Sequence, residues 1–285
     1  MYKCVVAIPV YKDCPKNSEL ASFKQVLSIL RNYDITVFTH RELDLSVYKN
    51  ISKDVQKTFF IEYFDKCFFE SVSGYNKLCY SKEFYNRFLS YDYMLIYQLD
   101  AWVFRDELKL WCEKGYDYIG APLFWSYSKN KYTTKMSSVG NGGFTLRRIS
   151  YCINILNHNK YLPFLKPSRI LIIYYNYFLY SDKYKAFKNK IKLIPYCILK
   201  FFGVRNNLNY YINVIQINED IVFGTNAKYA WGVKANIPTL KEAAKFSFEV
   251  HPDVLYKLLG NNLPFGCHAF EKWGYDTFWK NYIKF

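Results

Sequence analysis

The stretch YMLIYQLDAWVF, Tyr93 to Phe104, places a single carboxylate where a short apolar run ends. A run of this length is typical of a buried strand. Gln98, Leu99 and Asp100 follow it, and a second apolar run begins directly afterwards. Asp100 has two interpretations at this stage. Asp is common where a strand turns, but a carboxylate at a strand end can also bind hard cations such as Mg²⁺ and Mn²⁺.

The segments around this stretch alternate between strand and helix patterns. Apolar residues at helical spacing predict helices at residues 18–32, with Ser18 as the cap, and at residues 75–89. The expected strands are 3–11, 34–40, 57–64, 93–98 and 116–122. Strands that alternate with helices favour a parallel α/β sheet. Ligands of such sheets bind at the carboxyl ends of the strands, which is where Asp100 lies.

The composition indicates an ordered protein with an anionic partner. The chain has 285 residues and a net charge of +15, from 39 Lys and Arg against 24 Asp and Glu. This length allows one large domain, which we expect to span residues 1–285, or two small ones. The charge favours nucleic acid, an acidic membrane surface or phosphorylated substrates. The eight cysteines form no CxxC pair, so we expect reduced and mostly buried thiols.

Two features bear on where the protein acts. The N-terminus leads straight into the short run CVVAIPVY, and no run of about 18 apolar residues occurs, so we expect neither a signal peptide nor a transmembrane helix. This predicts a cytoplasmic protein. Residues 160–216 mix Leu, Ile and aromatic residues with many Lys and Arg, and Asp182 is their only carboxylate. They predict basic amphipathic helices, which either pack on the core or bind an anionic membrane at the inner face of the plasma membrane.

Two further segments carry polar residues that could form a site. SSVGNGGFTLRR, Ser137 to Arg148, has Asn141 among three glycines, which predicts either a tight hairpin or a loop whose backbone approaches a sugar. INEDIVFG, Ile217 to Gly224, has adjacent acids before an apolar, helical segment. Glu219 and Asp220 either interact with the helix dipole or supply a general base, whose pKa an apolar pocket would raise.

The segment PFGCHAFEKW, Pro264 to Trp273, contains one of the four histidines of the chain. His268 is either a satisfied polar residue or a ligand. Cys267 beside it is only a weak indication of zinc, because no second Cys/His pair completes a tetrahedral set.

The order of these segments is more specific than any one of them. A strand that ends in an acid, a glycine loop, a Glu-Asp pair and a late histidine resemble the plan of the metal-dependent GT-A glycosyltransferases, which use nucleotide-sugar donors. VVAIPVY is similar to the first nucleotide-binding strand of that superfamily. The chain more closely resembles a bacterial family of uncharacterised glycosyltransferase-like proteins, which has counterparts of GYNKL, YQLDAWVF, YIGAP, GNGGFTLRR, NEDIVFG, FSFE and PFGCH. The resemblance implies a GT-A, Rossmann-like α/β fold with a mixed, mostly parallel central sheet and a helical basic insertion at 160–216.

The resemblance also implies roles for single residues. Asp100 and His268 would bind Mn²⁺ or Mg²⁺ with the donor diphosphate. Gln98 stands where the superfamily has the first acid of its Asp-x-Asp motif, so one carboxylate is missing and the need for metal is open. Asp220 would be the base of an inverting transfer, with Glu219 beside it on the acceptor. The implied cofactor-binding positions are Pro9, Tyr11, Thr39, His40, Asn76, Lys77, Gln98, Asp100, Gly140, Asn141, Gly142 and Gly143.

The implied function is a hexosyltransferase of polysaccharide biosynthesis. A UDP-sugar is favoured over a GDP-sugar as donor, and the acceptor is a glycan or a polyprenyl-diphosphate-linked glycan. A sugar-phosphate or nucleotidyl transferase, and a non-catalytic carbohydrate-binding relative, fit the same features. Nucleic acid is not an expected partner, because the basic residues are interleaved with Ile and Leu and no nucleic-acid motif occurs.

Overall fold

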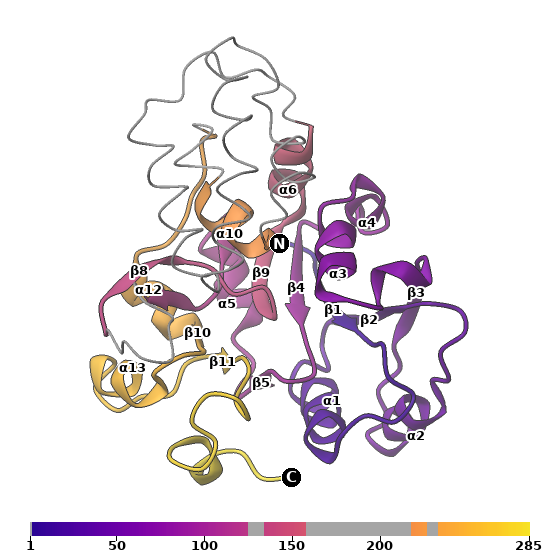
Figure 1. The fold of residues 1–285 in the computed structure, drawn as a ribbon, viewed down its shortest axis with the longest axis horizontal. Coiled ribbons are helices and arrows are strands. Elements are labelled where there is room, and N and C mark those ends of the chain that lie inside the picture. The colour runs from indigo at the N-terminus through magenta and orange to yellow at the C-terminus, as the bar shows by residue number, and fades with distance from the viewer. Residues whose placement is uncertain (1, 125–133, 158–217, 227–232) are drawn as a thin grey trace, which may run out of the picture.

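A six-stranded sheet forms the centre of the computed structural model, which describes residues 2–124, 134–157, 218–226 and 233–285. The strand order is β3-β2-β1-β4-β9-β6, and Figure 1 labels all of these strands except β6. β3, β2, β1 and β4 run parallel, and β9 is antiparallel to both of its neighbours. The expected α/β class with a mixed, mostly parallel central sheet is confirmed. The strands are β1 (Cys4–Pro9), β2 (Asp34–Thr39), β3 (Phe60–Tyr63), β4 (Tyr93–Tyr97), β6 (Tyr118–Ile119) and β9 (Phe144–Arg148).

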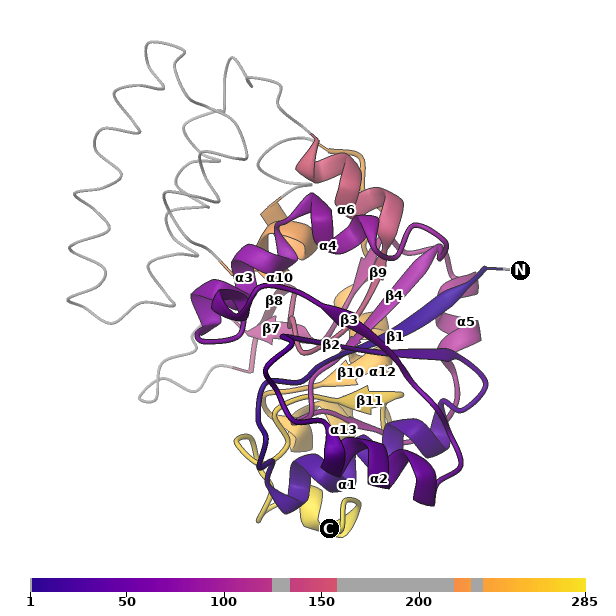
Figure 2. The same ribbon diagram turned by 90° about the vertical axis from the view of Figure 1, so that its right-hand side faces the viewer.

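Helices cover both faces of this sheet. α3, α4 and α6 lie along one face, and α1 and α2 lie along the other (Figure 2). Alternate residues of β1 serve the two layers, since Val5 and Ala7 pack in one core cluster and Val6 and Ile8 in the other. This is why β1 is a continuous apolar run. The helices are α1 (Asn17–Ile29), α2 (Ser46–Asp54), α3 (Val72–Cys79), α4 (Lys82–Asn86), α5 (Leu108–Glu113) and α6 (Ile149–Leu156).

The start of α1 differs from the prediction. The helix begins at Asn17 and its cap is Lys16, whose backbone N–H donates to the Glu19 carboxylate at 2.8 Å. The hydroxyl of Ser18 is buried and has no hydrogen-bond partner among the described residues. The predicted Ser18 cap is therefore wrong, because a carboxylate one turn further on performs that function.

The single helix predicted at residues 75–89 is also wrong, because the structure has α3 and α4 in its place. The Ser81 hydroxyl accepts the backbone N–H of Phe84 at 3.0 Å. Such a cap starts a new helix and ends the old one, even though the apolar spacing runs through both.

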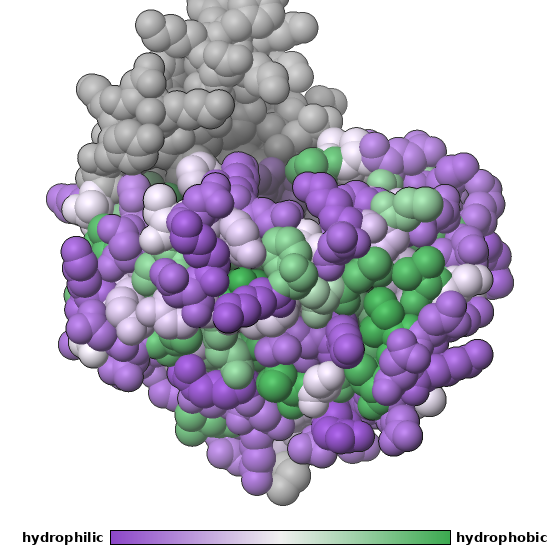
Figure 3. Space-filling view, turned by 90° about the horizontal axis from the view of Figure 1, so that it is seen from below, coloured by the Kyte–Doolittle hydropathy of each residue, from purple (hydrophilic) through white to green (hydrophobic). Residues whose placement is uncertain are grey.

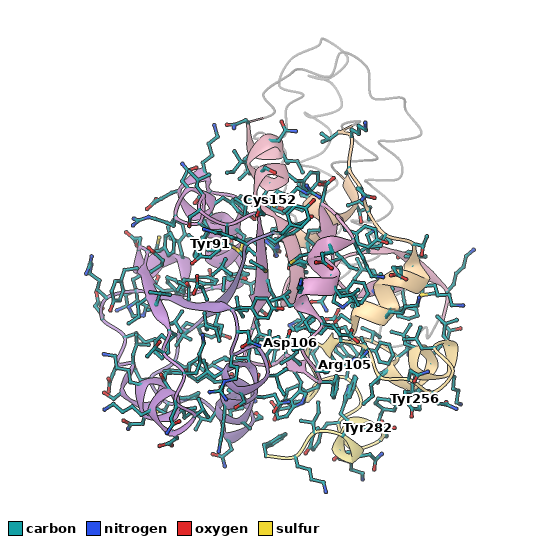
Figure 4. All side chains as sticks on the ribbon, turned by 180° about the vertical axis from the view of Figure 1, so that it is seen from behind. Tyr91, Arg105, Asp106, Cys152, Tyr256 and Tyr282 are labelled. Atoms are coloured by element: carbon teal, nitrogen blue, oxygen red, sulfur yellow. The ribbon has the colours of Figure 1, made fainter. Side chains whose placement is uncertain are left out.

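A second, three-stranded sheet has the order β10-β11-β5. Its strands are β5 (Trp102–Val103), β10 (Ser247–Phe248) and β11 (Gly266–Cys267), with α12 (Leu240–Phe246) before β10 and α13 (Pro252–Leu258) after it. β10 is parallel to β11, and β11 is antiparallel to β5. Arg105, labelled in Figure 4, donates to the carbonyls of Leu263 and Pro264 and so holds the chain that leads into β11. The second apolar run of the 93–104 stretch is thus β5, in a different sheet from β4.

The glycine segment crosses between two sheets. β7 (Pro122–Phe124) and β8 (Met136–Val139) pair with each other, so the strand expected at 116–122 divides between β6 and β7. The segment then connects β8 to β9, which belongs to the central sheet. The hairpin interpretation of residues 137–148 is therefore wrong, and the loop interpretation stays open.

Most of the described cysteines are buried. All seven described cysteines are free, and five of them are buried, among them Cys152 on α6, labelled in Figure 4.

The face seen in Figure 3 is mainly hydrophilic, with smaller hydrophobic areas between. No helix in the described ranges is long and apolar enough to cross a membrane. The insertion predicted at 160–216 lies outside the described residues.

Candidate active site

The three-stranded sheet brings Asp100 and His268 together. β11 is antiparallel to β5, with Cys267 paired to Trp102. His268, which follows β11, therefore lies at the same end of this sheet as Asp100 and Ala101, which precede β5. The Nε2 atom of His268 lies 3.1 Å from Oδ1 of Asp100. Two residues that are far apart in the sequence thus form an ion pair at the end of β4.

The central sheet adds Gln98 and Gly143 to this pair. β4 and β9 are antiparallel, with Tyr97 paired to Phe144, so Gln98 and Gly143 are the next facing positions. The backbone N–H of Gln98 donates to the Gly143 carbonyl at 2.8 Å. The side-chain Oε1 of Gln98 lies 3.2 Å from His268 Nε2. A Cβ on Gly143 would lie 2.0 Å from that nitrogen. Only glycine leaves room for the imidazole here.

His268 lies between two carboxylates. Its Nδ1 lies 3.4 Å from Oε1 of Glu249, on the side of the ring away from Asp100. Burial by itself lowers the pKa of His268, but Asp100 and Glu249 outweigh it and raise the pKa to about 10. Burial in turn raises the pKa of Asp100, but the adjacent imidazolium outweighs it and lowers that pKa. The pair is therefore ionised at neutral pH.

The donor set around His268 Nε2 suits a hard or borderline divalent cation. One carboxylate oxygen, one imidazole nitrogen and the Gln98 amide oxygen converge within hydrogen-bond distance. The described ranges contain no group of three or more His, Cys, Asp or Glu side chains arranged to hold a metal. Mg²⁺ and Mn²⁺ nevertheless need only one or two protein ligands when phosphate and water complete the shell. Asp100 and His268 fit such a cation, which would replace the Nε2 proton.

A cavity of about 460 Å³ opens beside Asp100. It lies where the strand order reverses between β1 and β4, the usual ligand position of open α/β sheets. It includes Pro9 and Tyr11, both predicted as donor-binding residues, and three lysines that were not predicted. The lining residues are Pro9, Tyr11, Lys12, Lys16, Glu19, Tyr48, Leu99, Asp100, Ala269, Glu271 and Lys272.

Asp220 lies at the start of α10 (Glu219–Ile221), which continues into the helical segment η2 (Val222–Asn226). Its two carboxylate oxygens accept the backbone N–H groups of Asn141 and Ile221, each at 2.8 Å. Burial, followed by the negative charge of Glu219, raises the pKa of Asp220 to about 7. A carboxyl with such a pKa can accept a proton at neutral pH.

Asn141 connects Asp220 to the His268 cluster. Its backbone binds Asp220, and its side-chain Oδ1 accepts the N–H of Gly143 at 3.0 Å. Asn141 has a φ of +74°, a left-handed conformation that Asn tolerates better than most residues. Its buried Nδ2 has no partner among the described residues. The glycine loop therefore bridges the two carboxylates that the sequence singled out, Asp100 and Asp220.

Glu219 lies against the glycine loop at Gly142 and pairs with Arg147. The Oε1 of Glu219 lies 2.5 Å from Arg147 Nη2, and the two side chains are 4% and 0% exposed. A Cβ on Gly142 would lie 2.5 Å from the same oxygen. The pair ties α10 to β9 beneath the glycine loop. The expected contact of Glu219 with an acceptor stays a prediction.

We expect Glu219→Gln to destabilise the protein strongly, because it leaves the buried Arg147 charge without a counter-charge. Breaking a buried pair from one side costs about 3–5 kcal/mol, measurable as the free energy of unfolding in urea. Glu83→Gln is the control, because it breaks the exposed i,i+4 pair with Arg87, and such pairs contribute about 0.3–0.5 kcal/mol. Equal losses in the two variants would contradict the buried-pair interpretation.

The other predicted positions lie around this centre. The Asn76 side chain on α3 donates a hydrogen bond to Asn218 Oδ1 and accepts the backbone N–H of Glu219 at 3.3 Å. Lys77 is exposed. Thr39 ends β2 and His40 follows it. The buried Oγ1 of Thr39 and Nδ1 of His40 have no partner among the described residues. A Cβ on Gly140 would meet the Leu123 side chain at 2.4 Å, so that glycine serves packing.

Sequence reasoning missed Glu249 and Arg147. Glu249 stands at the end of the short apolar segment FSFE, as Asp100 stands at the end of the apolar segment before it. The argument that singled out Asp100 therefore applies to Glu249 as well. Arg147 carries no such signal, because its burial depends on the pairing of β9 between β4 and β6.

Comparison with known families and curated proteins gives one match. A family described as "Protein of unknown function (DUF5672)" matches residues 58–268. That range includes α10, β10, β11 and His268, but not β1 or β2. No curated protein matches the sequence.

Three solved structures show weak similarity. Core-mannan synthase A (CmsA/Ktr4) from Aspergillus fumigatus, in a Mn/GDP form, is 12% identical over 53% of this chain and 60% of that chain, with a TM-score of 0.38. TarS 1-349 from S. aureus, in complex with UDP-GlcNAc, is 12% identical over 53% and 47%, with a TM-score of 0.34. A197 from STIV is 15% identical over 57% and 71%, with a TM-score of 0.26. The chain therefore spans less than two thirds of the mannan synthase and TarS chains.

Proposed function

The chain belongs to the family of unknown function that matches residues 58–268, and we propose that it is a metal-dependent GT-A glycosyltransferase that uses a nucleotide-sugar donor. One observation carries this proposal: the Asp100–His268 pair lies beside a cavity at the point between β1 and β4 where the strand order reverses. A strand-end carboxylate and an imidazole at such a cavity suit a nucleoside diphosphate that is bound through a cation.

Asp100 and His268 would hold Mn²⁺ or Mg²⁺, with Gln98 as a hydrogen-bonding neighbour. When bound, the cation neutralises charge on the departing nucleoside diphosphate. Pro9 and Tyr11 would contact the nucleotide, because both line the cavity. The imidazole would keep the diphosphate oxygens in place relative to Asp100.

Asp220 would act as the general base. Its carboxylate takes the proton of an acceptor hydroxyl while the hydroxyl oxygen bonds to the anomeric carbon of the donor sugar. The bond from that carbon to the diphosphate breaks, and its electron pair leaves with the nucleoside diphosphate. Attack opposite the leaving group gives inversion. Asn141 would support this step by holding Asp220 through its backbone N–H.

We propose a UDP-sugar rather than a GDP-sugar donor, and a glycan or polyprenyl-diphosphate-linked acceptor. The insertion at 160–216 would hold the enzyme at an anionic membrane surface, which co-sedimentation with anionic vesicles would test. A non-catalytic carbohydrate-binding relative is the competing function, because Gln98 replaces one acid of the superfamily motif.

Thermal unfolding with UDP, GDP, CMP and dTDP, each with Mn²⁺ or EDTA, tests the proposal. A ligand at 100 times its dissociation constant stabilises by about 2.7 kcal/mol, and we expect one nucleoside diphosphate to raise the Tm by roughly 5 °C with Mn²⁺ only. Asp100→Asn should remove the shift, because a neutral amide binds a divalent cation much more weakly than a carboxylate does. Asp253→Asn, at an exposed position on α13, should keep it.

Two outcomes would refute parts of this proposal. An equal shift in EDTA would exclude a role for the cation in binding. A shift without turnover of any nucleotide-sugar, in the presence of a panel of glycan acceptors, would favour the carbohydrate-binding relative.

A further inference from the structure

Strand register places Glu249 beside His268. β10 and β11 are parallel, with Phe248 paired to Cys267, so the next residues of the two strands are Glu249 and His268. The backbone N–H of His268 donates to the Phe248 carbonyl at 2.9 Å and extends the hydrogen-bonded ladder between β10 and β11. Each of the two side chains is 13% exposed. The contact is therefore fixed by paired backbone on both sides.

The imidazole of His268 has a carboxylate at each ring nitrogen. Nδ1 lies 3.4 Å from Glu249 Oε1, and Nε2 lies 3.1 Å from Asp100 Oδ1. Within the described part of the chain, no other basic side chain forms an ion pair with Glu249. A largely buried carboxylate is costly unless it is paired. Glu249 is therefore the carboxylate that pairs with Nδ1 of His268, although the two atoms are not in hydrogen-bonding geometry in this structure.

We propose that Glu249 is a positioning residue of the cation site: when a cation replaces the Nε2 proton, Glu249 accepts the Nδ1 proton of His268 and keeps the Nε2 lone pair directed towards the cation that Asp100 shares. This rests on the proposed function, in which Asp100 and His268 hold the cation. Histidines that bind metals usually donate their other ring N–H to a carboxylate or carbonyl, which fixes the tautomer and the ring plane. Glu249 acts through His268 and does not itself touch the cation or the donor.

The proposal is tested by titrating the full chain with Mn²⁺ and following free Mn²⁺ by electron paramagnetic resonance. We expect Glu249→Ala to lower the Mn²⁺ affinity 10- to 100-fold. Glu249→Gln should stay within about threefold of the wild type, because its amide oxygen still accepts the Nδ1 proton. A similar loss in both variants would show that charge, not orientation, matters and would overturn the proposal.

Glu242→Ala is the matched control. Glu242 lies on α12, its side chain is 16% exposed, and it pairs with Lys114 and Lys245. This variant removes the same charge from a carboxylate of similar burial but leaves His268 untouched. We expect wild-type Mn²⁺ affinity. A loss equal to that of Glu249→Ala would attribute the effect to net charge and overturn the proposal.

The tautomer of His268 gives a readout that a purely structural role would not change. In ¹⁵N NMR at a Mg²⁺ concentration that saturates the wild type, we expect Nδ1 of His268 to carry the proton in the wild type and in Glu249→Gln, and we expect this single tautomer to be lost in Glu249→Ala; the signal is assigned by its loss in His268→Gln. If the wild type binds no Mn²⁺, the metal part of the proposed function fails. If the wild type binds and Glu249→Ala binds equally well, only the role of Glu249 fails.

Discussion

Asp220→Asn is expected to lower the rate of sugar transfer by about 10²- to 10⁴-fold, the usual contribution of a general base. The amide cannot accept a proton from the acceptor hydroxyl, although it has nearly the same shape. One of the two backbone N–H donors, from Asn141 or Ile221, would then face the NH₂ group. We therefore expect a small loss of stability beside a large loss of rate. Release of nucleoside diphosphate measures the rate.

The pH dependence of the wild type gives a second test of Asp220. Burial and the charge of Glu219 raise the pKa of Asp220 to about 7, and the base acts only when it is deprotonated. The rate should therefore fall about tenfold per pH unit below pH 7 and level off above it. The residual rate of Asp220→Asn should lack this acidic limb.

Asp117→Asn is the control for both measurements. Asp117 also accepts a backbone N–H, from Asn236 at 2.7 Å, and pairs with Arg148 away from the site. It should keep the wild-type rate and the acidic limb. A wild-type rate in Asp220→Asn would instead move the base to another residue.

The central sheet was predictable because most of its parallel strands are buried on both faces. β1, β2 and β4 are apolar runs in sequence order, and burial on both faces removes the need for alternation. β3, at the edge of the sheet, is only partly buried. The break between α3 and α4 was not predicted, because the apolar spacing continues across it. A local hydrogen bond from Ser81 determines that break, and helical periodicity does not report it.

The site was predictable only in part, because the strands that assemble it are too short to be detected in the sequence. Asp100, Asp220 and His268 stand out in the sequence because each polar residue adjoins an apolar segment. The proximity of Asp100 and His268 depends on β5 and β11, which have two residues each. Strands of that length have no periodicity to detect. Glu249 follows a short apolar strand and could have been singled out in the same way as Asp100. The fully buried Arg147 depends on the pairing of β9 between β4 and β6, so its role became visible only in the structure.

Gly143→Ala is expected to abolish Mn²⁺-dependent nucleotide binding while the protein stays folded. A Cβ at this position would lie 2.0 Å from His268 Nε2 and 2.7 Å from Gln98 Oε1. The loop cannot easily move away, because the Gly143 N–H and carbonyl are both hydrogen-bonded, to Asn141 Oδ1 and Gln98 N. The imidazole must therefore swing away from Asp100. Overpacking of this kind costs about 1–3 kcal/mol of stability, but the loss of binding should be complete in the thermal-shift experiment.

Gly260→Ala separates this effect from general destabilisation. Gly260 follows α13 with a φ of +65°, and a Cβ there would meet only the Asn262 amide, at 4.0 Å. The left-handed backbone costs a non-glycine residue about 1–3 kcal/mol, so both variants should lose comparable stability. Gly260→Ala should keep the nucleotide shift, because its cost is paid far from His268. If Gly143→Ala keeps the shift as well, His268 does not take part in nucleotide binding, and the cation site reduces to Asp100.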